Sequence, residues 1–237
     1  MSADRLYFRQ LLSGRDFAVG DPVATQMVNF AYLIGDRETR EAVVVDPAYA
    51  VGDLLDALAA DDMRLTGVLA THHHPDHVGG SMMGFQLAGL AELLARESVP
   101  VHVNRNESDW VQRVTGVSAT DLTGHDHDDV IEVGAIPIRL LHTPGHTPGS
   151  QCFLVDDRLV AGDTLFLEGC GRTDFPGGDA EAMYRSLRWL ADLPGDPVVY
   201  PGHQYSSAPS ASLSSVKENN FVYRPRNLGE WHTMFGG

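Results

Sequence analysis

The sequence is poor in cysteine and lacks any long apolar run. Its only cysteines, Cys152 and Cys170, are too few for the disulfide framework of a small secreted protein and suit a reducing compartment. No stretch approaches the roughly 18 consecutive apolar residues of a membrane-spanning helix. The first residues also lack the apolar segment of a signal peptide. We therefore expect a cytoplasmic protein with no membrane partner.

Basic residues are scarce as well. The chain has 17 Lys and Arg against 32 Asp and Glu, which gives a formal net charge of −15. This charge argues against binding to the phosphates of nucleic acid. With 237 residues, 43% of them hydrophobic, the chain can bury a large core within one domain. We expect a single domain over 1–237, with 206–237 as a short C-terminal tail packed on the core, in a monomer or a homodimer.

Short apolar segments recur along the chain, and four of them are followed within five residues by a histidine or aspartate. These segments are 65–70, 136–141, 158–161 and 197–200. They read as strands, and the amphipathic segments 51–60, 85–96 and 180–193 read as helices. Loops at the ends of rigid strands are where functional sites are built. The pattern predicts two sheets packed face to face with helices outside.

The residues that follow these segments are typical metal ligands. The densest group lies within 71–77, in an H-x-H-x-D-H spacing. The full set is His72, His74, Asp76, His77, His146, Asp163 and His203. Borderline divalent metals prefer imidazole and carboxylate ligands. Seven ligands are too many for one tetrahedral ion and fit two ions that share a bridge. We predict two divalent ions, with zinc as the first choice and iron as the second.

The predicted ligands divide into two sets around one bridge. His72, His74 and His146 would hold one ion, Asp76, His77 and His203 the other, and Asp163 would bridge them. An oxygen trapped between two cations becomes hydroxide near neutral pH. We therefore predict a metal-bridging hydroxide as the nucleophile, with Asp76 and Asp163 as the catalytic carboxylates.

Two further histidine positions are interpreted as lying outside the site. His73 should point away from its neighbours and not bind metal. The segment 125–129, His-Asp-His-Asp-Asp, looks like a second cluster. It lies in a polar loop with no predicted strand before it, so we interpret it as an exposed acidic turn.

Longer motifs point to a known family. The segment 162–166, Gly-Asp-Thr-Leu-Phe, is similar to a glyoxalase II pattern, whereas 8–10, 32–47 and 169–175 (Gly-Cys-Gly-Arg-Thr-Asp-Phe) are closer to persulfide dioxygenases. The chain thus resembles the metallo-β-lactamase superfamily, and within it the glyoxalase II and persulfide dioxygenase group. The resemblance implies an α+β four-layer αββα sandwich with the site at one edge of two mixed sheets. It also implies that Asp46 orients a ligand, although a turn before Pro47 would explain this residue too.

Two activities follow from this resemblance. The first is a metal-dependent hydrolase of a thioester of the hydroxyacyl-thiol type. The alternative is a mononuclear non-heme iron persulfide dioxygenase, for which the resemblance implies one Fe(II) held by His72, His146 and Asp163. Either would act on a small thiol-derived molecule.

Substrate contacts are predicted at two positions. Arg172 could clamp a carboxylate with its planar guanidinium, or it could simply pair with Asp174. Tyr205, just after His203, could line the cleft. Asp174 stands where glyoxalase II tends to have an aromatic residue, and the chain after His203 has few basic residues. Both departures weaken the expectation that glutathione is the thiol.

Overall fold

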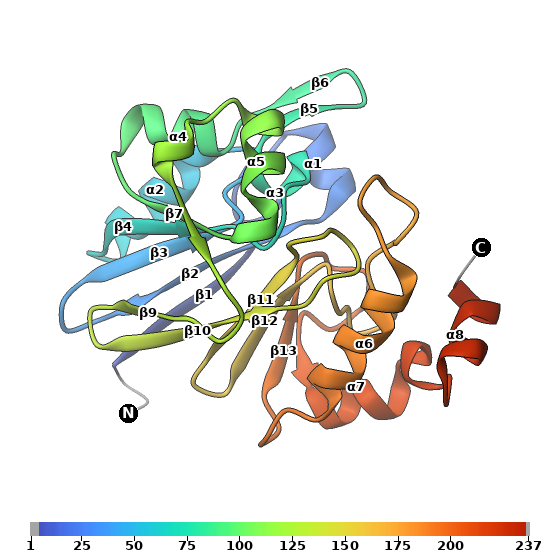
Figure 1. Ribbon diagram of the computed structural model, residues 1–237. Coiled ribbons are helices and arrows are strands. Elements are labelled where there is room, and N and C mark those ends of the chain that lie inside the picture. Colours follow the sequence, from blue (N-terminus) through green and yellow to red (C-terminus); the bar gives the residue numbers. More distant parts are fainter. Residues whose placement is uncertain (1–4, 236–237) are drawn as a thin grey trace.

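Two six-stranded sheets form the centre of the structure, a computed structural model that describes residues 5–235 (Figure 1). The first sheet has the order β1-β2-β3-β4-β7-β8, and the second β14-β13-β12-β11-β10-β9. The strands of the first sheet are β1 (Leu6–Leu12), β2 (Phe30–Asp36), β3 (Glu41–Val45), β4 (Arg64–Leu69), β7 (Val101–Asn104) and β8 (Leu122–His125). Those of the second are β9 (Val130–Val133), β10 (Ile136–His142), β11 (Gln151–Val155), β12 (Arg158–Gly162), β13 (Val198–Pro201) and β14 (Ala211–Ser212).

Strand β2 shows why each sheet needs a layer on both faces. Phe30, Tyr32 and Ile34 belong to the core between the two sheets, whereas Ala31 and Leu33 belong to the core beneath the helices. Successive side chains of a strand point to opposite faces, so a continuous apolar run must be covered twice. The long apolar strands therefore require a helical layer outside each sheet.

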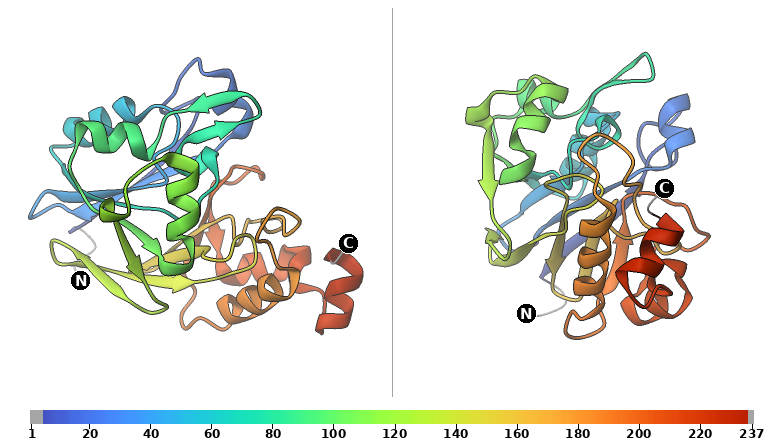
Figure 2. Two further views of the ribbon diagram at one scale, coloured as in Figure 1. Left: turned by 45° about the horizontal axis from the view of Figure 1, so that its top comes forward. Right: turned by 45° about the vertical axis from the view of Figure 1, so that its right-hand side comes forward.

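The helices supply those outer layers (Figure 2). Residues of α2 (Val51–Ala60), α4 (Leu90–Arg96) and α5 (Ser108–Thr115) join the core outside the first sheet. Residues of α6 (Ala180–Ala191), α7 (Leu213–Asn219) and α8 (Leu228–Phe235) join the core outside the second. The predicted four-layer αββα sandwich is confirmed. Within residues 5–235, no helix is both long and apolar enough to span a membrane.

The predicted helix over 85–96 is wrong in its first half. The chain instead forms a small hairpin of β5 (Gly80–Met82) and β6 (Phe85–Leu87), and α4 begins only at Leu90. A Cβ atom at Gly89 would lie 2.3 Å from the carbonyl oxygen of Val78. This close packing of two backbone segments holds Gly89 in an extended conformation, so α4 begins after it. The local periodicity of the sequence cannot reveal such a contact.

The interpretation of 125–129 as a loop without a preceding strand is also wrong. Strand β8 ends at His125 and pairs in parallel with β7. Strand β8 was not predicted because the strand is only partly buried and carries no apolar run. Two helices were missed as well, the short α1 (Pro22–Met27) and the C-terminal α8, and α3 (Pro75–Val78) is a single turn inside the histidine cluster.

One buried side chain ties the C-terminal segment to the loop that follows β12. The amide of Asn220 donates to the carbonyl oxygens of Phe166 and Gly169, both at 2.9 Å. Its oxygen accepts from the Gly169 N–H at 2.8 Å and from the Val222 N–H at 3.2 Å. Asn220 is 1% exposed, so water cannot replace these partners. Residues after α7 are thereby held against the 166–169 loop.

We expect Asn220→Ala to lower the free energy of unfolding by about 2–3 kcal/mol, because it leaves buried backbone groups of Phe166 and Gly169 without partners. The adjacent Asn219→Ala is the matched control. Asn219 is exposed and bonds only within α7, so its loss should change stability by no more than about 0.5 kcal/mol. Urea denaturation measures both, and equal effects would contradict the role assigned to Asn220.

Candidate metal centre

All seven predicted ligand residues meet at one edge of the sandwich. Strands β10, β12 and β13 run in the same direction, because β12 pairs in parallel with β13 and β10 is related to β12 through two antiparallel pairings. Their carboxyl ends therefore reach one edge, where the loop after β4 also arrives. The donor atoms form three groups, each within 4.8 Å: His72, His74 and His146; Asp76, His77 and His203; and His72, His77 and Asp163.

The first group consists of three imidazoles whose ring nitrogens face a common point. His74 Nδ1 lies 3.1 Å from His72 Nε2 and 2.9 Å from His146 Nε2. His72 follows β4, and His146 follows β10. His72 and His146 are buried, whereas His74 is partly exposed. Burial, followed by the charge of neighbouring His146, lowers the pKa of His74 to about 3, so this ring is neutral at physiological pH.

The second group has two imidazoles and one carboxylate. His77 Nε2 and His203 Nε2 lie 3.2 Å apart. Asp76 Oδ2 is 3.6 Å from His77 Nε2 and 3.4 Å from His203 Nε2. Asp76 and His77 lie on the short helix α3, whose proline start permits a tight turn directly after His74. All three side chains of the group are buried.

Asp163 lies between the two groups. Its Oδ1 is 3.4 Å from His77 Nε2, and its Oδ2 is 3.7 Å from His146 Nε2 and 3.4 Å from His203 Nε2. The buried Oδ1 has no hydrogen-bond partner. A Cβ atom at Gly202 would lie 2.3 Å from Oδ1, which explains the glycine before His203. A carboxylate that reaches both groups has the geometry of a bridging ligand.

Outer hydrogen bonds orient the histidine rings. The Nδ1–H of His146 donates to the carbonyl oxygen of Arg172 at 2.7 Å, and that of His203 to the carbonyl oxygen of Met27 at 2.8 Å. His77 Nδ1–H donates to Asp46 Oδ2 at 2.9 Å. Each of these rings then presents the lone pair of Nε2 toward the site.

Asp46 both turns the chain after β3 and contacts a candidate ligand, His77. Its backbone φ of +52° makes a turn after β3. Its carboxylate also accepts from the Thr71 N–H at 2.8 Å and the Thr71 hydroxyl at 2.6 Å, in addition to His77. The side chain thus fixes the start of the histidine loop relative to β3.

These contacts fit a divalent metal. Two lone pairs that face each other at 3.2 Å, as on His77 and His203, repel unless a proton or a cation lies between them. Burial lowers the pKa of His77, but the carboxylates of Asp163, Asp76 and Asp46 outweigh it and raise that pKa to about 10. A proton therefore satisfies the group in the metal-free protein, and a metal ion must displace it.

Two buried residues that support the site were missed by the sequence analysis. The amide of Asn29 donates to Asp76 Oδ2 at 3.2 Å and accepts from the Tyr49 hydroxyl at 2.8 Å. Glu107 binds His73 through the ring Nδ1 at 2.5 Å and the backbone N–H at 2.8 Å. The His73 ring lies 4.9 Å from that of His74 but belongs to none of the three donor groups. Both residues lie next to a strand end, which is the only signal that could have found them.

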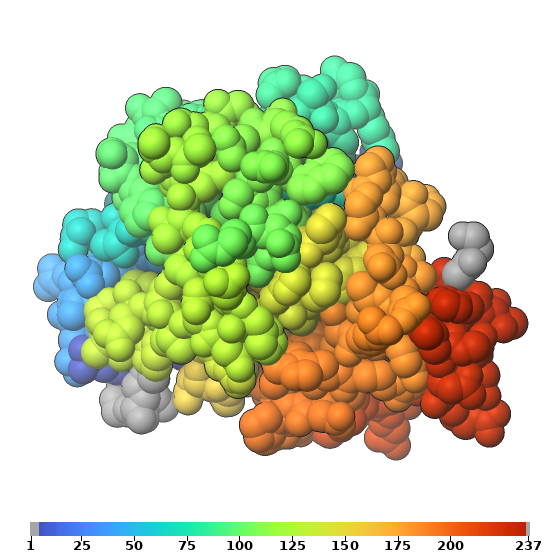
Figure 3. Space-filling view, in the orientation of Figure 1, coloured from blue at the N-terminus to red at the C-terminus, as the bar shows by residue number. Residues whose placement is uncertain are grey.

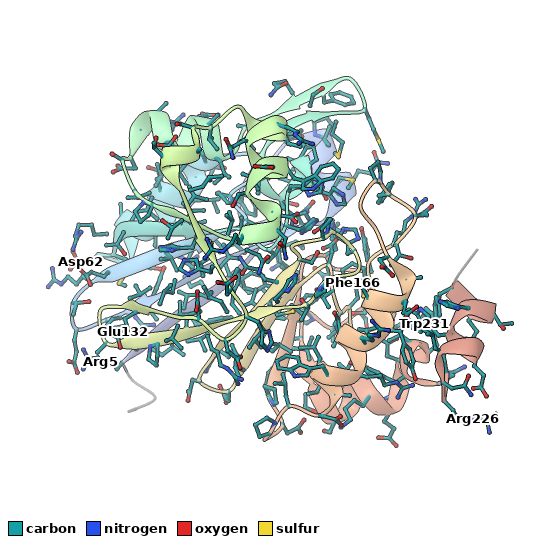
Figure 4. All side chains as sticks on the ribbon, in the orientation of Figure 1. Arg5, Asp62, Glu132, Phe166, Arg226 and Trp231 are labelled. Atoms are coloured by element: carbon teal, nitrogen blue, oxygen red, sulfur yellow. The ribbon has the colours of Figure 1, made fainter. Side chains whose placement is uncertain are left out.

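A cavity of about 1130 Å³ opens at the donors His74, Asp76, His146, Asp163 and His203. Both predicted substrate residues line it. The Tyr205 ring stacks on His203, with 4.8 Å between centroids and 8° between planes. Arg172 pairs with both carboxylate oxygens of Asp174, at 2.9 and 2.6 Å, so the alternative interpretation of this arginine is realised in the structure. Phe166, labelled in Figure 4, also lines this cavity.

Comparisons with known proteins agree with this geometry. The model of the metallo-beta-lactamase superfamily matches residues 24–203. A hydroxyacylglutathione hydrolase of Alkalilimnicola ehrlichii is 41% identical over 194 residues, which cover 81% of this chain and 68% of that protein. The human mitochondrial persulfide dioxygenase ETHE1 is 37% identical over 193 residues, 80% of this chain and 68% of that protein.

A solved structure shows the same fold at full length. The crystal structure of ETHE1 from Myxococcus xanthus superimposes with a TM-score of 0.79 at 32% identity, covering 98% of this chain and 90% of that one. The proteins to which this chain is similar thus include both hydrolases and dioxygenases. The family match over most of the chain, the αββα sandwich and the clustered histidines and aspartates together show that this chain belongs to the metallo-beta-lactamase superfamily.

Proposed function

We propose that the chain is a metal-dependent hydrolase that cleaves a thioester of a small thiol. The observation that carries this proposal is the presence of two three-donor groups with Asp163 between them. Two zinc ions are the first choice, because histidine nitrogen and carboxylate oxygen in small sets suit zinc. The similarity to a hydroxyacylglutathione hydrolase supports a thioester as the substrate.

In this proposal His72, His74 and His146 would hold one ion, Asp76, His77 and His203 would hold the other, and Asp163 would contribute a ligand to both. When bound, the ions acidify a water molecule and polarise a carbonyl oxygen. The Asp46 carboxylate keeps His77 in the tautomer that binds through Nε2. Asp76 lines the cavity and would accept the proton that the attacking water releases.

The second candidate is an iron-dependent persulfide dioxygenase. The likeness to ETHE1 of Myxococcus xanthus over 98% of the chain favours it. His72, His146 and Asp163 would then hold one Fe(II), as two histidines and one carboxylate do in non-heme oxygenases. Oxygen uptake when a persulfide is added to the iron-loaded protein would support this activity, and no uptake would reject it for that persulfide.

We expect Asp163→Asn to reduce thioester hydrolysis by more than about 100-fold, since the loss of an outer contact to a metal ligand already costs 10–100-fold. Elemental analysis should also find fewer metal ions in the variant than in the native protein. Asp157→Asn, in the exposed turn between β11 and β12, is the control and should change neither quantity. Full activity with full metal content in Asp163→Asn would contradict the bridging role.

Metal affinity should rise with pH between about 6 and 9. The pKa of His77 is raised to about 10 in the metal-free protein, so zinc binding must release a proton and weakens as pH falls. Affinity should increase about tenfold per pH unit for each proton released. Calorimetric titration in buffers of different ionisation enthalpy counts these protons. His77→Gln should release fewer, while the exposed His232→Gln should match the native count; a pH-independent affinity would reject this mechanism.

A further inference from the structure

We propose that the cavity binds its substrate through a long apolar acyl chain, and that the C-terminal residues 221–235 form the wall on which this chain packs. The proposal rests on the proposed thioester hydrolase, whose site it extends. The donors His74, His146, Asp163 and His203 line the same cavity as this wall. A carbonyl at the donors therefore places the adjoining acyl chain within reach of it.

Exposed apolar side chains gather around this cavity. Of the eight large hydrophobic residues that are exposed among residues 5–235, five line it: Met83, Phe175, Tyr205, Phe221 and Met234. Met83 is 86% exposed and Met234 is 51% exposed. Single exposed apolar residues are common, but a contiguous group around a cavity marks a binding site for an apolar partner.

The C-terminal wall is held rigidly in place. The Phe221 and Phe235 rings stack with 5.8 Å between centroids, and Phe235 also lies 4.2 Å from the Trp231 ring. Trp231 is fully buried and donates from Nε1 to the carbonyl oxygen of Ala180 at 2.7 Å, which fixes α8 on α6 (Figure 4). The bonds of Asn220 to the 166–169 loop hold the other end. In the space-filling view, α8 (red) lies beside the orange segment around 180 (Figure 3).

Another part of the lining comes from the first half of the chain. It includes Met82 and Met83 of the β5–β6 hairpin, together with Trp110 and Val114 of α5. Methionine is unbranched and polarizable, so it fits chains of different shape. A lining of aromatic rings and unbranched methionine side chains suits an extended alkyl chain more than a compact polar group.

Charge in the cavity disfavours an anionic substrate tail. Apart from the proposed metal donors and the buried His73, the charged or titratable side chains that line the cavity are Glu168, Cys170, Arg172, Asp174 and Tyr205. The only cation of this set, Arg172, is already paired with Asp174. Glutathione carries two carboxylates, and no free cation in the lining would receive them. The cavity therefore fits an uncharged apolar chain.

The test is a series of thioesters of the uncharged thiol N-acetylcysteamine, with acetyl, hexanoyl and decanoyl groups. We expect kcat/KM of the zinc-loaded protein to rise with chain length, by roughly fourfold per methylene that the cavity buries, as about 0.8 kcal/mol per buried CH₂ implies. Lactoylglutathione should be cleaved more slowly than the decanoyl thioester. Cleavage of all three acyl groups at similar rates would overturn this inference but leave the hydrolase intact, whereas no cleavage of any thioester would overturn the hydrolase itself.

Variants locate the acyl chain. Phe221→Ala and Met83→Ser, from segments distant in the sequence, should each lower kcat/KM for the decanoyl thioester at least fivefold more than for the acetyl thioester. Phe85→Ala is the control, because Phe85 is 53% exposed but does not line the cavity. Melting temperatures show whether each variant is folded.

A binding measurement separates chain recognition from catalysis. A non-hydrolysable decanoyl thioether analogue should bind to the metal-free protein, with calorimetric affinity that Phe221→Ala and Met83→Ser weaken and Phe85→Ala does not. Equal affinity in all variants would overturn the inference. Faster cleavage of an acetyl ester of a long alkyl thiol than of the decanoyl thioester would place the apolar chain on the thiol side and overturn the acyl assignment.

Discussion

The candidate site brings ring nitrogens and carboxylates that repel one another into a buried space, and the rest of the structure must hold them there. His77 and His203 present ring nitrogens to each other at 3.2 Å, and the Asp163 carboxylate approaches both within 3.4 Å. Such an arrangement is costly unless a cation or a proton lies within it. The surrounding hydrogen bonds, from His77 to Asp46 and from His203 to Met27, keep the rings from turning away. The protein thus holds these side chains close together despite their mutual repulsion.

The two sheets make this arrangement possible. Each apolar strand is covered on both faces, so the strand ends are rigid, and loops from both sheets meet at one edge. Only tight turns without a side chain fit there, which explains the glycine that precedes His146, Asp163 and His203. The same edge continues into the cavity, where α5, the β5–β6 hairpin and the C-terminal helix surround the site. The covering of both sheets on both faces thus determines where the candidate site and the cavity lie.

Most of the site was predictable from sequence because its signals are local. A His or Asp within a few residues of the end of an apolar strand marks a position at a sheet edge, and four such cases converge on one place. The partners in contacts between distant segments could not be read from local patterns: Asn220 bonds to the 166–169 loop, and Glu107 binds His73, 34 residues away. Strand β6 was mistaken for the start of a helix because the contact that delays α4, the packing of Gly89 against Val78, lies in the tertiary structure.

The central claim is that this edge holds two metal ions bridged by Asp163. The most direct test is elemental analysis of freshly purified protein, with metal content expressed per chain. The account predicts two ions per chain, zinc or a mixture that contains zinc. One iron per chain with little zinc, unchanged after incubation with excess zinc and removal of free metal, would contradict it and favour the dioxygenase.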